Sequence, residues 1–156
     1  MSSPCSPLTG LPEEHQLMGS LLELMRREQQ HLVAAEIEAL TEVTAEKSQL
    51  VGRLALLAGE RHSALGAAAC APDESGMDSW LAGRPDAVAA TLWNALLERT
   101  REAKELNRVN GMLVNRHLAH TQGALNALHP QPQAGAFYGP SGQTTSGAAS
   151  RRVVIG

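Results

Sequence analysis

The sequence is short of aromatic residues and of cysteine. Aromatic residues make up only 3% of the 156 residues, whereas the apolar residues, at 43%, are mostly alanine and leucine. This composition is typical of packed helices rather than of sheets or ligand-binding cores. The two cysteines, Cys5 and Cys70, are too few for a disulfide scaffold, so we expect a reduced, cytoplasmic setting. The length suits a single domain.

Targeting and membrane-spanning signals are also missing. The first residues, MSSPCSPLTGLPEEHQ, have neither the basic start nor the apolar run of a signal peptide. The longest apolar stretches, such as LALLAG from Leu54, fall far short of the ~20 residues that cross a bilayer. We therefore expect a soluble protein that stays on the side of the membrane where it is made.

Residue patterns that would assemble a reaction or hold a metal ion are lacking. His117 and His120 are three residues apart, but no Cys, Asp or Glu follows within reach, and structural zinc needs four ligands. There is no glycine-rich phosphate loop with its Lys-Ser or Lys-Thr, and neither cysteine has a histidine in a plausible dyad context. We expect no enzyme activity, no cofactor and no metal.

An excess of positive charge is absent as well. The 13 basic residues against 16 acidic residues give a net charge of −3, which provides no field that attracts nucleic acid. Residues 106–156 contain no acid, but their arginines lack the aromatic neighbours of nucleic-acid-binding segments. These arginines are Arg108, Arg116, Arg151 and Arg152. We expect no nucleic-acid partner.

What the sequence does contain is helical periodicity. Residues 1–12 hold three prolines and are predicted to form an unstructured leader. A proline and two glutamates then suit a helix start, and leucines recur at helical spacing over residues 13–34. A coiled-coil-like seam covers residues 36–69. Because no Pro, Gly or capping residue separates these runs, we interpret 13–69 as one long helix kinked near 34–37, or as two helices in line.

A break and a second long helix follow. Residues 70–76 contain Pro, Gly and Asp and predict a loop, and the stretch after them allows one short turn of helix. The last helix is predicted over residues 86–128, about 64 Å long, and ends before two prolines. Residues 129–156 are rich in Gly, Ser, Thr, Pro and Gln, which predicts a flexible tail. We thus predict an all-α fold for residues 13–128, an elongated antiparallel helical hairpin or three-helix coiled-coil-like bundle with a disordered C-terminal tail.

Polar residues interrupt the apolar stripe in the second half of the last helix. Asn107, Asn110 and His117 lie on or beside the stripe, and Gly111 lowers helix propensity by about 1 kcal/mol relative to alanine. One interpretation is that Asn110 sets the register of the hairpin, as a buried asparagine does in coiled coils. The other is that the chain covers this half only partly, leaving a groove for an amphipathic partner helix.

The single Phe and the single Tyr are adjacent in the predicted tail. The segment around Phe137 and Tyr138 is too polar to form a hydrophobic core into which they could pack. They are typical of the anchor of a short linear motif that docks on another protein. The alternative is that they fold back onto the helical seam.

Taken in order, these segments resemble the FlgN family of flagellar type III export chaperones. LLELMRREQQHL, with its central Glu28, is similar to the first helix of the family. EIEALTEVTAEKSQLVGRLALLAGERHSAL, with Lys47 and Arg61 in the seam, is similar to the second. The more specific part is NRVNGML, from Asn107, followed by YGPSGQT in the tail. The resemblance covers roughly residues 13–144.

The resemblance implies a cytoplasmic chaperone of the flagellar type III export system. Such a protein would bind the C-terminal amphipathic helix of hook-associated proteins at the hook–filament junction, prevent their premature assembly and deliver them to the export gate and its ATPase complex. The implied contacts with the export gate are Phe137 and Tyr138. The implied substrate-binding residues are Leu106, Asn107, Val109, Asn110, Leu113, Val114, His117, Leu118 and Leu125. The competing hypothesis is a self-associating structural coiled-coil subunit or adaptor, which would be a tight dimer in isolation.

Overall fold

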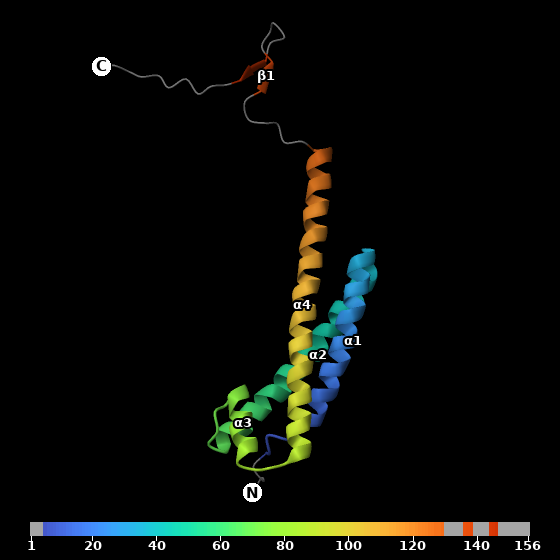
Figure 1. Cartoon of the computed structure of the whole chain (residues 1–156). Coiled ribbons are helices and arrows are strands. Elements are labelled where there is room, and N and C mark those ends of the chain that lie inside the picture. The colour runs from blue at the N-terminus through green and yellow to red at the C-terminus, as the bar shows by residue number, and fades with distance from the viewer. Residues whose placement is uncertain (1–4, 130–135, 139–143, 147–156) are drawn as a thin grey trace, which may run out of the picture. The chain divides into compact units, whose positions relative to one another are not determined.

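A computed structural model describes residues 5–129 and the backbone of two short strands beyond them (Figure 1). The predicted all-α hairpin fold is confirmed for residues 5–129. The elements are α1 (Leu11–Ala34), α2 (Ile37–Ala67), α3 (Glu74–Ala82), α4 (Ala87–Leu128), β1 (Ala136–Tyr138) and β2 (Thr144–Ser146).

Helix α1 begins two residues earlier than predicted. Pro12 occupies its first turn together with Glu13 and Glu14, whose carboxylates suit the positive end of the helix dipole. Leu11 is fully buried in the core. Because its packing fixes the backbone at this position, the helix begins at Leu11. Leu11 and Pro12 therefore belong to the helix and not to the predicted leader, of which residues 1–4 lie outside the described part of the chain.

The junction between the first two helices is a sharp reversal, so both sequence interpretations of it were wrong. Ala35 adopts a left-handed conformation with φ 55°, and the amide of Glu36 donates to the carbonyl oxygen of His31. Such a left-handed residue ends a helix, although it is usually glycine or asparagine. The sequence offers alanine there and hence no stop signal. Helix α2 then runs antiparallel to α1, as the ion pairs of Glu14 with Arg61 and Glu28 with Lys47 show.

Helix α3 is longer than the single turn predicted and starts inside the expected break. Asp73 caps it, because its carboxylate accepts hydrogen bonds from the backbone amides of Ser75 and Gly76 at 2.9 and 3.2 Å. Gly76 packs against the preceding loop, where an added Cβ would lie 1.8 Å from the carbonyl oxygen of Ala71. The aspartate signal was present in the sequence, but the close approach at Gly76 was not visible.

Helix α4 follows its sequence signals closely. Asp86 caps it by accepting from the amides of Val88 and Ala89, both at 3.1 Å. The helix starts one residue after the predicted position and ends at the predicted Leu128. A difference of one residue is within the variation of helix-end assignment.

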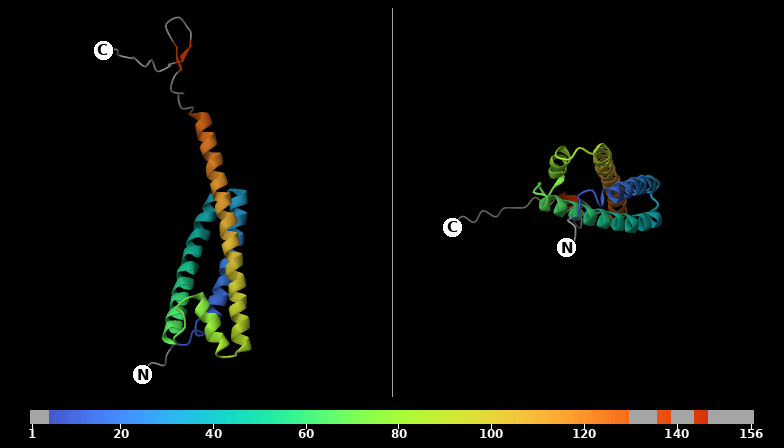
Figure 2. Two further views of the ribbon diagram at one scale, coloured as in Figure 1. Left: turned by 60° about the vertical axis from the view of Figure 1, so that its left-hand side comes forward. Right: turned by 90° about the horizontal axis from the view of Figure 1, so that it is seen from below.

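The chain divides into two units, Met1–Arg116 and His117–Gly156. In the first unit, α1, α2 and α4 lie side by side, with α3 across one end (Figure 2). One hydrophobic cluster lies at the α3 end and the other farther along the three long helices. The first contains Leu11, Leu65, Met77, Trp80, Trp93 and Leu96, and the second contains Leu21, Leu22, Met25, Leu54 and Ala103.

The second unit contains the last turns of α4 and an antiparallel pair of strands. Strand β1 pairs with β2 in the register Phe137 opposite Thr145 and Tyr138 opposite Thr144. The sequence did not predict these strands. The rest of the predicted tail, residues 130–135, 139–143 and 147–156, lies outside the described residues.

Candidate functional site

A layer of polar side chains joins the three long helices near the middle of α4. Lys47 Nζ on α2 donates to Glu28 Oε2 on α1 at 3.1 Å and to Asn107 Oδ1 on α4, also at 3.1 Å. Asn110 Nδ2 donates to the same Glu28 oxygen at 2.8 Å. Because each member depends on partners from other helices, this layer fixes how the helices are aligned along their axes.

Asn110 is the most buried member of the polar layer, with 2% of its surface exposed. Its amide nitrogen also donates to the backbone carbonyl oxygen of Met25, at 2.9 Å. Its Oδ1 atom is buried without a hydrogen-bond partner among the described residues. These contacts favour the register interpretation for Asn110, since the side chain points toward α1.

The other predicted binding residues of the first unit sit at the margin of the bundle. Leu106 packs against the second hydrophobic cluster and is half-buried. Val109 and Leu113 are also half-buried, whereas Asn107 and Val114 are exposed. This part of α4 is thus only partly covered by the rest of its unit.

The predicted binding residues of the second unit are more exposed. His117 is half-buried, but Leu118 is 63% exposed and Leu125 is 49% exposed. Leu125 is seven residues beyond Leu118, and Leu128, three residues further on, is 74% exposed. Residues spaced in this way lie on one face of a helix. The last turns of α4 therefore present an apolar face, which we call the Leu118 face (Leu118, Leu125 and Leu128).

The two predicted export-gate residues lie in β1. The structure describes the backbone of Phe137 and Tyr138, which pairs with β2, and does not describe their side chains. Their predicted role therefore stays a prediction.

Sequence reasoning missed a groove in the first unit, between α2 and α4. It has a volume of about 460 Å³ and is lined by α1 at its floor and by α2 and α4 at its walls. Val51 and Ala55 contribute from α2, and Leu97, Arg101 and Lys104 contribute from α4. We call it the α2–α4 groove. From α2 only Ala55 and Ala58 line it with small side chains, which gave no signal in the sequence that distinguishes a groove from an ordinary helix surface.

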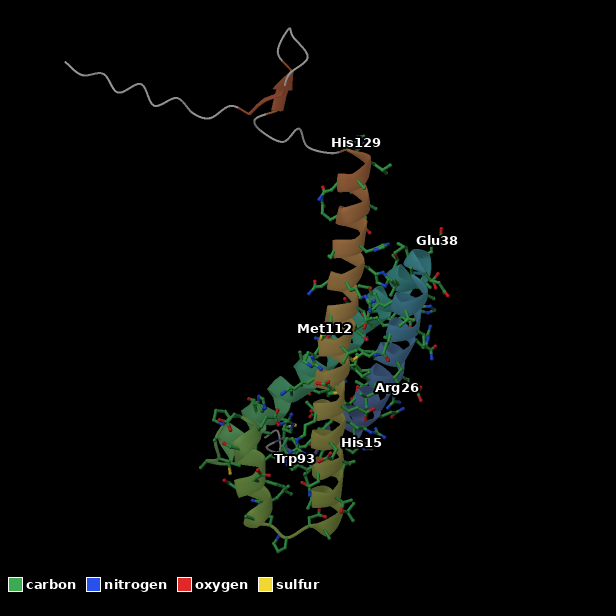
Figure 3. All side chains as sticks on the ribbon, turned by 45° about the horizontal axis from the view of Figure 1, so that its top comes forward. His15, Arg26, Glu38, Trp93, Met112 and His129 are labelled. Carbon is green, nitrogen blue, oxygen red and sulfur yellow. The ribbon has the colours of Figure 1, made fainter. Side chains whose placement is uncertain are left out.

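A buried ion-pair cluster closes the α3 end of the α2–α4 groove. The guanidinium of Arg61 donates to both oxygens of Glu14, at 3.0 and 3.1 Å, and more weakly to Glu74 on α3. It also lies 4.8 Å from the ring centre of Trp93, a cation–π distance. In Figure 3, Trp93 lies at the end of α4 beside α3.

Arg61 stays charged although it is buried. Burial by itself lowers the pKa of the Arg61 guanidinium, but its hydrogen bonds and charge interactions with Glu14 and Glu74 outweigh burial and raise the pKa above its ordinary value. The cluster is therefore an internal clamp that ties α1, α2 and α3 together, and its charges are already matched by one another.

Two further observations bear on the sequence predictions. Among the residues whose side chains the structure describes, no three His, Cys, Asp or Glu residues gather closely enough to hold a metal ion. Within the same part of the chain, none of the helices combines the length and apolar character needed to cross a bilayer.

Comparisons with known proteins agree with one another. The sequence model of the family described as FlgN protein matches residues 6–146. The flagella synthesis protein FlgN of Salmonella typhimurium (strain LT2) is 30% identical over 131 residues, which are 83% of each chain. The protein of the same name from Proteus mirabilis is 28% identical over 141 residues, 88% of this chain and 90% of the relative. No solved structure gives a significant match.

Proposed function

The chain belongs to the FlgN family, and we propose that it is a cytoplasmic chaperone of the flagellar type III export system. In this proposal it binds the C-terminal amphipathic helix of hook-associated proteins, prevents their premature assembly and delivers them to the export gate. The proposed activity is binding and release, without catalysis.

The observation that supports this proposal is the exposure of the Leu118 face. Burial of apolar surface stabilises a protein by roughly 25 cal/mol per Å², so leucines left in water on a regular helix favour association with another apolar surface. An amphipathic helix would complete the packing through anchors spaced three and four residues apart. A client helix fits this face better than a small ligand does, because the leucines follow one line along a helix.

Polar residues around the proposed contact suit reversible binding. His117 and Thr121 lie among the leucines and keep the uncovered helix soluble. No side chain lies within 4 Å of the position that a Cβ would take on Gly111, so packing does not require glycine there. Its low helix propensity is consistent with a segment that adapts to a client. A chaperone must also release its client, which moderate affinity permits.

The predicted contacts nearer the bundle remain part of the proposal. Leu106, Val109, Leu113 and Val114 would extend the apolar contact along α4, and Asn107 would contribute a polar group beside it. Asn110 would support client binding indirectly, because its hydrogen bonds to α1 hold α4 in place. Phe137 and Tyr138 would contact the export gate.

Isothermal titration calorimetry with the full chain tests this proposal. The ligand is a synthetic peptide of the C-terminal helix of a hook-associated protein, and light scattering first establishes the mass of the free chain. We expect one-to-one binding, weakened about thirtyfold or more by Leu118→Asp, as for the loss of a central anchor. His120→Asp is the matched control, since it places the same charge on the opposite side of α4. A tight dimer that binds no peptide would instead support the self-associating coiled coil.

A further inference from the structure

We propose that the α2–α4 groove is a second docking site, which takes an amphipathic helix with acidic residues along one edge. The groove belongs to the first unit, whereas the Leu118 face belongs to the second. The inference therefore goes beyond the client contact described above and concerns a different partner surface.

The groove has the dimensions of a short helix. Its lining extends from Trp93 to Lys104 along α4 and from Val51 to Arg61 along α2. At 1.5 Å per residue, each wall is about 15–17 Å long. That length matches about three helical turns, which is enough for anchors at positions i, i+3 or i+4, and i+7.

The floor and one wall of the groove are apolar. Met18 and Leu21 of α1 form the floor, and Val51, Leu54 and Ala55 of α2 form the wall. Val51 is 46% exposed and Ala55 is exposed. Three packed helices therefore leave a face on which a fourth helix would bury side chains that now contact water.

The charge of the groove is confined to its α3 end and one edge. At the α3 end, Glu14 and Glu74 are already paired with Arg61. On the edge formed by α4, Arg101 and Lys104 lie three residues apart on one face of the helix. The α2 side between Val51 and Ala58 contributes only apolar lining residues. The groove thus presents a cationic rim on one side only.

The cations of this rim are available to a partner. Arg101 contacts Glu98 one turn away, at the surface, and such exposed pairs are weak and exchange readily. Lys104 is exposed and forms no ion pair within the part of the chain that the structure describes. A partner helix whose carboxylates face α4 would satisfy both cations while its apolar face fills the groove.

A pair of synthetic helices provides the test. Each has about 15 residues with leucines at i, i+3 and i+7, and one carries glutamates along one edge where its twin carries lysines. Binding to the full chain is measured by fluorescence anisotropy at low salt. We expect the glutamate peptide to bind at least about fivefold more tightly than its twin, as for partly exposed charge pairs. The double variant Arg101→Glu with Lys104→Glu should reverse this preference.

Two tryptophan variants locate the binding. Ala55→Trp fills the groove and should abolish binding of the glutamate peptide, whereas Ala45→Trp, on an exposed part of α2 outside the groove, should leave it unchanged. Leu118→Asp should also leave it unchanged, which separates this inference from the proposed client contact. Equal binding of the two peptides, or full binding to Ala55→Trp, would overturn the inference. A dimer that Ala55→Trp dissociates would overturn it too, since a second copy would then occupy the groove.

Discussion

The amide nitrogen of Asn110 in α4 lies 2.9 Å from the backbone carbonyl oxygen of Met25 in α1. This hydrogen bond joins two helices that are far apart in the sequence, and the same amide also donates to Glu28 at 2.8 Å. A residue in the middle of the most family-like stretch of the sequence is thus engaged inside its own bundle, where it holds α4 against α1.

Asn110→Ala should therefore destabilise the fold. The substitution removes both hydrogen bonds that Asn110 donates to α1, a loss of about 1–3 kcal/mol. Urea unfolding followed by circular dichroism measures the change, and Asn94→Ala, at an exposed position of α4, is the control with little expected effect. An unchanged midpoint for Asn110→Ala would mean that the polar layer does not hold the helices together.

Arg61→Met should destabilise the fold more strongly. It leaves the carboxylate of Glu14 buried at 3% exposure without its partner, a change that costs about 3–5 kcal/mol in buried ion pairs. Adding Glu14→Leu should recover most of this loss, because no unpaired charge then remains inside. If the double variant is no more stable than Arg61→Met alone, the loss of stability comes from the lost packing of Arg61 against Trp93 and not from the unpaired charge of Glu14.

The stability of the fold should depend on His15 as the pH falls below 6.5, the ordinary pKa of histidine. Burial, and then the charge of Arg99, lower the pKa of His15 below its ordinary value of 6.5. The unfolded chain therefore takes up the proton first, so stability falls as the pH drops through 6.5 toward the lower folded pKa. His15→Gln should flatten this part of the curve in thermal unfolding at several pH values. Parallel curves for the two proteins would contradict the assignment.

Two glycines should respond to alanine in opposite ways. At Gly76 an added Cβ would lie 1.8 Å from the carbonyl oxygen of Ala71, so Gly76→Ala should destabilise by about 1–3 kcal/mol, as overpacking does. At Gly111 no side chain lies within 4 Å of the added group, so Gly111→Ala should stabilise by up to about 1 kcal/mol. Thermal unfolding measures both. Stabilisation by Gly76→Ala would contradict the close packing of α3 on its loop, and destabilisation by Gly111→Ala would contradict the open position of Gly111.

The sequence predicted those parts of the fold that depend on neighbouring residues in the chain. Helix α4 followed from a capping Asp86, a long periodic stretch and the prolines after His129. The reversal at Ala35 could not be predicted, because its left-handed conformation is imposed by the packing of α1 on α2 and not by a glycine. The strand pairing of Phe137 with Thr145 could not be predicted either, because the composition of this segment is typical of flexible tails.

The candidate site was predictable only as a set of residues on one helix. Periodicity placed Asn110 on an apolar stripe, and the family resemblance implied Leu118 as a binding residue. Neither could tell that Asn110 contacts α1 while Leu118 is exposed. The α2–α4 groove was missed for the same reason. Ala55 and Lys104 are far apart in the sequence, and they line the same groove only after three helices have packed together.

Hydrogen exchange measured by mass spectrometry shows whether α4 binds the client. The full chain is compared alone and when saturated with a peptide of the C-terminal helix of a hook-associated protein. The proposed contact predicts slower exchange over residues 113–128 of α4, and loss of that protection in Leu118→Asp. Unchanged exchange over these residues, with protection elsewhere in the chain, would contradict the claim that α4 binds the client.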